Sequence, residues 1–435
     1  MAGRARPDRR TDAGRARPDR RTDAKRARQD REGPEDLIRG SLDHCVKCTI
    51  CESYCPVARA TPLFPGPKYV GPQAERFRTG GVSPDDSLDY CSGCGICTHV
   101  CPQGVKIAEI NARARRSLKE RKGIPLRDKI IARPTLTAKL ANPVAPLANW
   151  TLRNQALRTV AEKAIALHRR APMPTFAGRT FQRWARKHEA PTLERSVVYF
   201  HGCSTNYFEP DLGAKTVAVL EHNGFNVIIP KGQDCCGLPL QSNGLFDDAR
   251  TYVERLVGKL APYAREGYDI VATSSSCGLM LKREAHEILG MSNDDLEVVS
   301  SRMYDICEFL AELHDRGELE TDFKPLPMSV PYHAPCQQRG HEIGKPALDL
   351  FALIPELEVT DFDHACCGIA GTYGLKKEKY GIAMDVGAGL FAQIRDAAPD
   401  LAVCDSETCR WHIEKATGVP NVHPVEVLHR AYGLS

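Results

Sequence analysis

Four cysteines and a proline stand at fixed spacing in the run Cys45-Val-Lys-Cys48-Thr-Ile-Cys51-Glu-Ser-Tyr-Cys55-Pro56. The pattern returns as Cys91-Ser-Gly-Cys94-Gly-Ile-Cys97-Thr-His-Val-Cys101-Pro102. Three thiolates two residues apart fit one face of a cubane, and the cysteine before the proline reaches the other cluster. The spacing therefore predicts two [4Fe–4S] clusters. We expect one to be held by Cys45, Cys48, Cys51 and Cys101, and the other by Cys91, Cys94, Cys97 and Cys55.

Structural zinc is the alternative, because zinc sites also use paired C-x2-C cysteines. Zinc calls for neither a third cysteine at the same step nor the proline, and here both occur twice. After the second run, apolar residues at helical spacing predict a helix. They are Ile107, Ile110, Ala114 and Leu118. With 35 residues between Cys55 and Cys91, this favours a helical ferredoxin-type domain over a small β-ferredoxin.

The chain of 435 residues has 18 cysteines and a net charge of +4. No apolar run approaches the roughly 18 residues of a membrane-spanning helix, so we exclude an integral membrane protein. The N-terminus carries no apolar core typical of an export signal. We therefore expect a reducing compartment, in which clustered cysteines bind metal more often than they form disulfides.

Charge divides the chain into blocks. Residues 1–33, 34–112, 113–187 and 188–435 carry net charges of +6, −2, +16 and −16. The first block repeats every 11 residues and lacks Leu, Ile, Val and aromatic residues, so we expect a disordered, solvated tail. For this Arg-rich tail we favour no role in binding nucleic acid. The second block is the expected ferredoxin domain and the third a basic connector.

The fourth block is a duplication. Cys203, Cys235–Cys236 and Cys277 are matched by Cys336, Cys366–Cys367 and Cys409, at offsets of 133, 131 and 132 residues. We therefore expect two α/β repeats, 188–327 and 328–435, which follow the α-helical first domain in the chain. Strands are predicted at 195–200, 226–230, 268–273, 328–332 and 401–403, and helices at 214–222 and 247–260. Cysteines just past the carboxyl ends of parallel strands gather at the edge where such sheets bind ligands.

Each repeat contains a Cys-Cys-Gly sequence, Cys235-Cys236-Gly237 and Cys366-Cys367-Gly368. Adjacent thiolates can serve neighbouring irons, and we expect the glycine to let the backbone approach the cluster. Redox-sensing or buried structural cysteines are the alternative. The matched duplication favours iron–sulfur ligation by Cys203, Cys235, Cys236, Cys277, Cys336, Cys366, Cys367 and Cys409.

These motifs together resemble the iron–sulfur subunits of anaerobic dehydrogenases and heterodisulfide reductases. Within that group, the local sequence from about Ser41 to the C-terminus is similar to the C subunits of anaerobic glycerol-3-phosphate dehydrogenases. The matching segments are Phe64-Pro-Gly-Pro-Lys68, His201-Gly-Cys203, the run from Cys366 to Lys379, Glu407-Thr-Cys-Arg-Trp411 and the Arg179–Arg186 region.

The resemblance implies an electron conduit that is not catalytic alone. Flavoprotein partners of the A and B type would oxidise glycerol 3-phosphate, and this chain would pass the electrons to menaquinone. It would lie peripherally at the cytoplasmic face of the bacterial inner membrane. A conduit for glycolate or lactate oxidation and a heterodisulfide-reductase-like subunit are the alternatives.

Two positions depart from the family pattern, in which each Cys-Cys-Gly unit ends in C-x2-C and could supply five thiolates to a non-cubane cluster. Ser274 and Ser406 stand where the family has cysteine. Cys404 lies two residues before Ser406 and is a possible substitute. Cys307 matches nothing, and we expect a buried thiol. The cluster type in this domain, and whether it holds one or two further clusters, stay open.

The basic connector offers a helical stripe over 148–168 that reads as a membrane-surface contact. The stripe comprises Trp150, Leu157, Val160, Ala164 and Leu167, flanked by Arg153, Arg158, Lys163, Arg169 and Arg170. Docking of the +16 block against the −16 block is the other interpretation. Three histidines near cysteines, His201, His333 and His364, could act on cluster sulfur or a quinone, but we favour structural roles. Gly387-Ala-Gly389-Leu-Phe-Ala392 matches a dinucleotide fingerprint but follows helix-like sequence, which favours chance.

Overall fold

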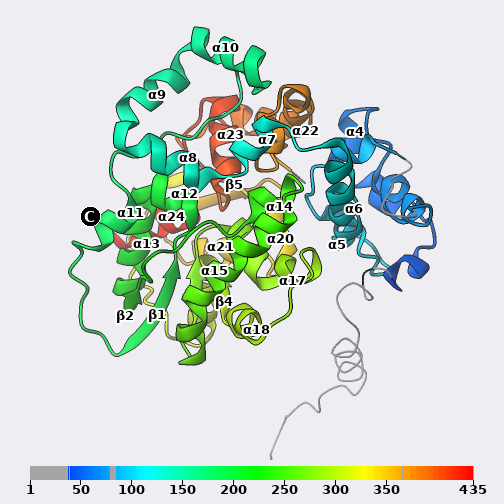
Figure 1. Ribbon diagram of the computed structural model, residues 1–435. Coiled ribbons are helices and arrows are strands. Elements are labelled where there is room, and N and C mark those ends of the chain that lie inside the picture. The colour runs from blue at the N-terminus through cyan, green and yellow to red at the C-terminus, as the bar shows by residue number, and fades with distance from the viewer. Residues whose placement is uncertain (1–37, 39, 79–84, 365, 435) are drawn as a thin grey trace, which may run out of the picture.

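The computed structural model describes residues 38, 40–78, 85–364 and 366–434 (Figure 1). The Arg-rich repeat of residues 1–33 lies outside them. The described part of the N-terminal domain is helical and contains no strand. Short elements carry the cysteine runs, and the longer α6 (Ile107–Lys122) follows them. The short elements are η1 (Ser41–His44), α3 (Ile50–Ser53), α4 (Pro56–Ala60), the π-turn η2 (Tyr69–Gln73), η3 (Ser87–Tyr90) and α5 (Ile96–His99).

Helix α6 buries the predicted apolar stripe, Ile107, Ile110, Ala114 and Leu118. The helix extends across residue 112, so it joins the N-terminal domain to the basic connector. The N-terminal domain packs against the second cysteine repeat, because Leu118 and Ile96 share one apolar cluster with Ile382 and Val386. The helical domain is thus fixed to the α/β part rather than tethered by a free linker.

The connector is a series of short helices. It comprises α7 (Leu126–Ile131), α8 (Pro134–Ala141), η4 (Asn142–Val144), α9 (Ala145–Arg153), α10 (Gln155–Ile165) and α11 (Phe181–Ala185). Helices α9 and α10 form a lobe at the top of Figure 1. The single helix expected over 148–168 is wrong, because Asn154 ends α9 and caps α10 with its side chain, which accepts from the amides of Ala156 and Leu157. Leu167 lies past α10 and pairs with Lys376 in an isolated bridge.

Each cysteine repeat forms a four-stranded sheet in which every pair of neighbouring strands is parallel. The orders are β2-β1-β3-β4 and β6-β5-β7-β8, so the duplication seen in the sequence is a duplication of topology. The strands are β1 (Arg195–Phe200), β2 (Phe225–Ile228), β3 (Ile270–Ala272), β4 (Met303–Asp305), β5 (Met328–His333), β6 (Leu357–Asp361), β7 (Ala402–Cys404) and β8 (Asn421–Val422).

Helices cover both sheets and join them. In the first repeat they are α12 (Gly202–Tyr207), α13 (Pro210–His222), α14 (Leu238–Ser242), α15 (Phe246–Arg265), α16 (Ser275–Leu279), the π-turn η5 (Met280–Glu284), α17 (Ala285–Glu287), α18 (Asp294–Ser301) and α19 (Ile306–Asp315). In the second they are α20 (Cys336–Gly340), α21 (Pro346–Phe351), η6 (Tyr373–Leu375), α22 (Lys377–Ala397), α23 (Glu407–Thr417) and α24 (Pro424–Tyr432).

The two repeats share one hydrophobic core. The last helix of each repeat packs against the other repeat, α19 against α21 and α24 against α13. Buried Tyr199 and Tyr332, from equivalent strands, lie in the same apolar cluster. This exchange makes the two sheets one body and holds their cysteine-bearing edges together.

Candidate metal centres

The first cysteine run surrounds a cavity of about 20 Å³. The cysteines that line it are Cys45, Cys48, Cys51 and Cys101. Burial, Glu52 and the other three cysteines raise the pKa of Cys51 to about 11. Four thiols that converge on one cavity are the donor set that a cationic metal centre would bind as thiolates. The residues present therefore fit a thiolate-bound cluster.

A second cavity of about 20 Å³ lies beside the second run. It is lined by Cys91, Cys94, Cys97 and, from the first run, Cys55. Burial raises the pKa of Cys55 to about 11, and burial together with Cys366 and Cys55 raises the pKa of Cys94. The cysteine before each proline thus lies with the other run, as the spacing predicts.

The two runs adopt the same backbone with different residues. Gly93 and Gly95 have φ of 73° and 76°, and Lys47 and Thr49 hold the equivalent left-handed positions at 59° and 67°. A non-glycine residue in this region costs on the order of 1–2 kcal/mol. Such local strain is typical of a loop whose shape is set by what it binds.

In the first repeat, four cysteines follow three strands and meet at one edge. Cys203 follows β1, Cys235 and Cys236 follow β2, and Cys277 follows β3. Hydrogen bonds from Cys203 and Cys236 hold the pKa of Cys235 well below its usual range. The Cys236 thiol in turn lies in hydrogen-bond contact with Cys277. The sulfurs therefore form one connected group.

The second repeat builds the same group. Hydrogen bonds from Cys336 and Cys367 hold the pKa of Cys366 well below its usual range. Cys367 Sγ lies 2.9 Å from Cys409 Sγ. The first cysteine of each vicinal pair is the acceptor in both repeats, so the duplicated sequence reproduces the chemistry as well as the fold.

The glycine of each Cys-Cys-Gly serves helix packing. Gly237 and Gly368 have φ of 87° and 93°, and a Cβ there would meet the backbone oxygen of Ala249 in α15 or Ala383 in α22 at 2.9 and 1.9 Å. The glycine's absent side chain lets a long helix approach the cysteine pair. The expectation that this glycine lets the backbone approach the cluster stays a prediction.

The two serines occupy different environments. Ser274 caps α16, accepting from the amide of Cys277 at 3.3 Å and donating to Glu407 at 3.3 Å. Ser406 is buried and lines the large cavity described below. Cys404 is buried in an apolar cluster with Cys409, and it is not among the residues that line the cavity.

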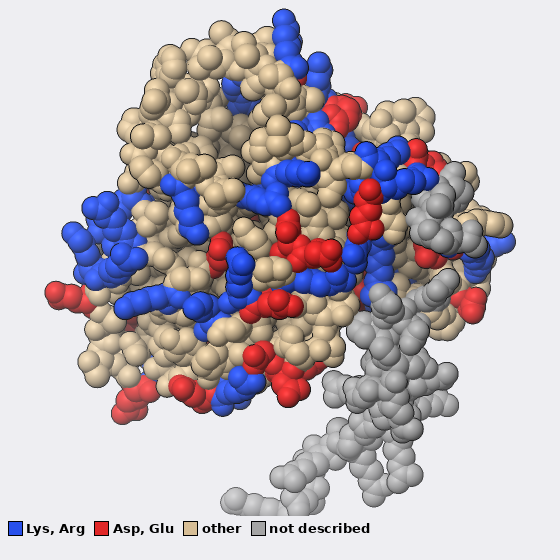
Figure 2. All heavy atoms as spheres, in the orientation of Figure 1, with Lys and Arg blue, Asp and Glu red and all other residues tan. Residues whose placement is uncertain are grey.

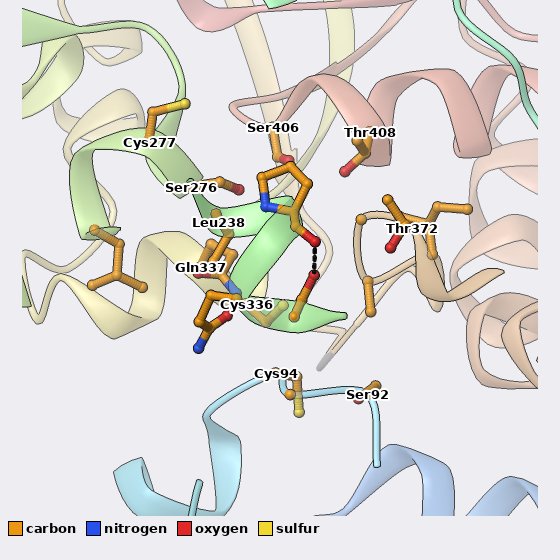
Figure 3. Close-up of a pocket in the computed structure, with 18 of the residues that line it drawn as sticks. Ser92, Cys94, Leu238, Ser276, Cys277, Cys336, Gln337, Thr372, Ser406 and Thr408 are labelled. Atoms are coloured by element: carbon orange, nitrogen blue, oxygen red, sulfur yellow. Dashed lines mark hydrogen bonds between the residues drawn. The ribbon is translucent and has the colours of Figure 1, made fainter. Parts of the chain in front are cut away.

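A cavity of about 450 Å³ lies between the N-terminal domain, the connector and both repeats (Figure 3). In Figure 3, Cys94 faces Cys336 from below, Cys277 lies across the space, and Ser406 and Thr408 lie above it. The cavity is also lined by Cys203, Cys235, Cys236, Cys366, Cys367 and Cys409. One space thus brings together the second cysteine run and both repeats.

The three histidines near cysteines are buried or half-buried. Burial lowers the pKa of His201 and of His333 to about 4. His201 bonds to Gln182 and to the carbonyl oxygen of Gly202, while both ring nitrogens of His333 are buried without a hydrogen-bond partner among the described residues. His364 contacts the carbonyl oxygen of Val386 at 3.2 Å. The Gly387–Ala392 fingerprint lies within α22, away from any strand-to-helix turn, as the chance interpretation predicts.

Sequence reasoning missed one cluster. Cys307 is buried as expected, but Asp305 and Asp405, one from each repeat, lie with it so that one ligand atom of each falls within 4.8 Å of the others. Asp305 ends β4 and Asp405 follows β7, so the signal was again residues at strand ends. The spacing of these two aspartates in the sequence matches no known motif, so it did not indicate that they lie together.

Residues 41–105 match the family model of the 4Fe-4S dicluster domain, and residues 197–282 and 330–414 match that of the cysteine-rich domain. The C subunit of anaerobic glycerol-3-phosphate dehydrogenase from Escherichia coli K12 is 38% identical over 402 residues, covering 90% of this chain and 98% of that one. The B subunit of fumarate reductase (CoM/CoB) from Methanothermobacter marburgensis is 32% identical over 237 residues, 54% of this chain and 44% of that one. Lactate utilization protein A 1 from Bacillus mycoides is 26% identical over 246 residues, 55% and 96%. The chain is therefore an iron–sulfur protein.

Proposed function

The chain belongs to the family of C subunits of anaerobic glycerol-3-phosphate dehydrogenases, and from this premise we propose that it conducts electrons from flavin-bearing partner subunits to menaquinone. The observation that carries the proposal is the continuity of its cysteine sites. Cys94 of the second run influences the pKa of Cys336 and is itself influenced by Cys366. The second N-terminal site therefore adjoins the second repeat, and the 450 Å³ cavity adjoins both repeats.

In this proposal the N-terminal domain, 34–112, holds two [4Fe–4S] clusters. One is held by Cys45, Cys48, Cys51 and Cys101, and the other by Cys55, Cys91, Cys94 and Cys97. The grouping of these thiols around two cavities supports the assignment. When bound, such clusters supply one-electron transfer at potentials set by charge, hydrogen bonds and exposure. The chain's own part is to place the thiolates and to exclude water.

The repeats, 188–327 and 328–435, would hold further iron–sulfur ligation at four thiols each. The connected sulfurs of each repeat support this. Ser274 is engaged as a helix cap, which makes it a poor replacement ligand, whereas Ser406 faces the cavity. Cys404 approaches the second group through Cys409, so it remains the one additional thiol within reach among the described residues.

The connector, 113–187, would rest on the membrane. Helices α8 to α10 expose Leu136, Leu140, Val144, Leu147, Trp150, Leu157 and Val160, with Leu140 at 72% and Trp150 at 57% exposure. Figure 2 shows that the lobe of α9 and α10 is mostly uncharged surface with Lys and Arg beside it. No described helix is long and apolar enough to cross a bilayer. Exposed apolar side chains flanked by cations fit an interfacial contact at the cytoplasmic face.

Charge docking accounts for part of the basic block. Arg127 pairs with Glu378 at 2.8 Å, Arg116 with Asp247 at 3.3 Å, and Arg133 with Asp248. Other cations form no ion pair in the part of the chain that the structure describes, and they are available to anionic headgroups, each contributing about 1 kcal/mol. They include Lys139, Arg153, Lys163 and Arg170. Both interpretations of the connector therefore apply, to different faces.

The test is reduction of the centres by substrate. The chain is combined without oxygen with flavoprotein subunits of an anaerobic glycerol-3-phosphate dehydrogenase, and its magnetic resonance spectrum is recorded after glycerol 3-phosphate is added. We expect cubane signals to appear, with one signal missing in Cys48→Ser and none missing in the control Cys307→Ser. If only lactate or glycolate reduced the centres, the electron donor would be that alternative substrate and not glycerol 3-phosphate.

A heterodisulfide-reductase-like activity would be detected by a different assay. The isolated chain, supplied with a reduced dye, would then turn over a small disulfide. We expect no turnover, because the vicinal thiols lie in metal-ligand groups in this proposal.

A further inference from the structure

Three carboxyl groups gather at one wall of the large cavity. Glu109 comes from α6, Glu284 from the π-turn η5, and Glu287 from α17. None of the three is a proposed metal ligand, and the electron path through the thiols uses none of them. They place carboxyl groups at a cavity that is also lined by cysteines and apolar side chains.

Glu284 is the member without a partner. Its Oε2 atom is buried and makes no hydrogen bond among the described residues. It ends the π-turn Met280–Glu284, and such turns interrupt α-helices frequently at functional sites. A buried carboxyl oxygen with no protein donor is unusual unless it is protonated.

The charges around Glu284 favour its neutral form. Burial, with Glu109 and Glu287 facing it from α6 and α17, raises its pKa to about 8, and only Arg283 on its own turn opposes this. Arg283 is shared, because it also bonds to Glu287 at 3.3 Å and to Glu342 at 2.9 Å. At neutral pH Glu284 therefore carries a proton that it can give up.

One of the three carboxyls reaches solvent. Glu287 is 28% exposed and pairs with Lys106 at 2.9 Å. Glu109 is buried and accepts from Thr98 at 2.8 Å. A proton lost from Glu284 can thus be replaced from the surface at Glu287, whereas the thiol groups offer no such route.

We propose that Glu284 protonates a quinone oxygen bound in this cavity, with Glu287 and Glu109 resupplying the proton. The inference rests on the proposed function, because reduced flavin in the partner subunits provides the two electrons through the iron–sulfur centres. Each electron is matched by one proton. The O–H bond of Glu284 breaks as a quinone O–H bond forms, the carboxylate is reprotonated from solvent, and the second oxygen is protonated in the same way to give the quinol.

The test uses the assembled complex with a water-soluble naphthoquinone and, separately, a one-electron dye that accepts from the flavin. We expect Glu284→Gln to lower quinone reduction about 100-fold, the usual scale of a positioned acid, while dye reduction and iron content stay unchanged. Glu284→Asp should retain part of the rate. The matched control is Glu254→Gln, which removes an exposed carboxyl that does not line the cavity and should leave the rate within twofold.

Two further readouts separate proton delivery from a structural role. Wild-type quinone reduction should fall as pH rises above about 8, where Glu284 ionises, and this limb should be absent in Glu284→Gln. Binding of the naphthoquinone should quench the fluorescence of Trp411, which lines the cavity, equally in wild type and Glu284→Gln, and Trp411→Phe should remove the quench.

The outcomes distinguish the inference from the proposed function. A wild-type complex that reduces the dye but not the quinone overturns the quinone assignment, and the inference with it. A complex that reduces the quinone equally well with Glu284→Gln, with an unchanged pH profile, overturns the inference alone. Equal loss in Glu284→Gln of quinone reduction, dye reduction and iron assigns Glu284 a structural role and also overturns it.

Discussion

Thr49 and Gly95 hold equivalent left-handed positions in the two cysteine runs, one with a side chain and one without. The cysteine spacing alone predicted the grouping of thiols, because thiolate geometry around a cubane leaves few alternatives. Other features of single residues could not be predicted from the sequence. The packing role of Gly237 and the partners of Cys307 depend on segments far away in the chain, and no local spacing encodes them.

The glycine loop offers a prediction at this scale. Gly95→Ala should lower the free energy of unfolding by about 1 kcal/mol, because an L-residue resists φ of 76°. A Cβ at Gly95 has no neighbour within 4 Å, so only the backbone is tested. The control is Gly317→Ala, which has φ of 70° and equally open space. Both variants should lose stability in urea unfolding, but only Gly95→Ala should release iron faster to a chelator. Equal iron release would contradict the account.

The serine at position 274 gives a second prediction. Ser274→Ala should cost about 1 kcal/mol, because it removes the cap of α16. Ser406→Ala removes a hydroxyl at α23 that makes no capping bond and should cost less. Thermal unfolding of both variants measures the difference, and a larger loss for Ser406→Ala would show that its hydroxyl binds the metal centre.

Elements with strong periodicity were predicted well. Helix α6 and the strands β1 and β5 lie where the sequence indicates, because their apolar patterns are long or rich in β-branched residues. The two-residue strand β8 and the π-turn η5 carry no pattern that distinguishes them from loop or helix. The break at Asn154 was missed because the apolar spacing continues across it, whereas the capping side chain ends the helix.

The connector lobe yields a prediction for this scale. Leu140→Glu combined with Leu147→Glu should reduce binding to anionic vesicles at least tenfold, since each inserted leucine contributes on the order of 1–2 kcal/mol. Neutralising Arg153, Lys163 and Arg170 should weaken binding at low salt only. The control is Phe77→Glu, an equally exposed apolar residue in the N-terminal domain. Vesicle cosedimentation that Phe77→Glu reduces as much as the leucine pair would place the contact elsewhere.

At the scale of the whole molecule, ion pairs join the second repeat to the connector and to the N-terminal domain. Lys376, which precedes α22, bonds to Asp128 of α7 at 2.9 Å, and both are buried. Lys379 of α22 bonds to Asp89 beside the second cysteine run at 3.2 Å. The sequence predicted the duplication and the helical domain, but it could not predict the exchange of α19 and α24 or these contacts, since they depend on how the parts dock.

The docking contact gives the prediction for this scale. Asp128→Asn should destabilise the chain by about 3 kcal/mol, because it leaves the buried Lys376 ammonium without its counter-charge. The surface pair Arg302–Asp269, at 3.1 Å, provides the control, and Asp269→Asn should change stability by less than about 1 kcal/mol. Equal effects of the two variants in urea unfolding would show that the buried pair does not fasten the domains.

The central claim is that this polypeptide holds inorganic clusters on thiolates of its two N-terminal runs. Quantification of iron, acid-labile sulfide and zinc in the chain purified without oxygen tests it most directly. We predict at least about eight iron atoms and a matching amount of sulfide per chain, falling by about four in Cys48→Ser. Colourless protein that contains zinc, or no metal, would contradict the account.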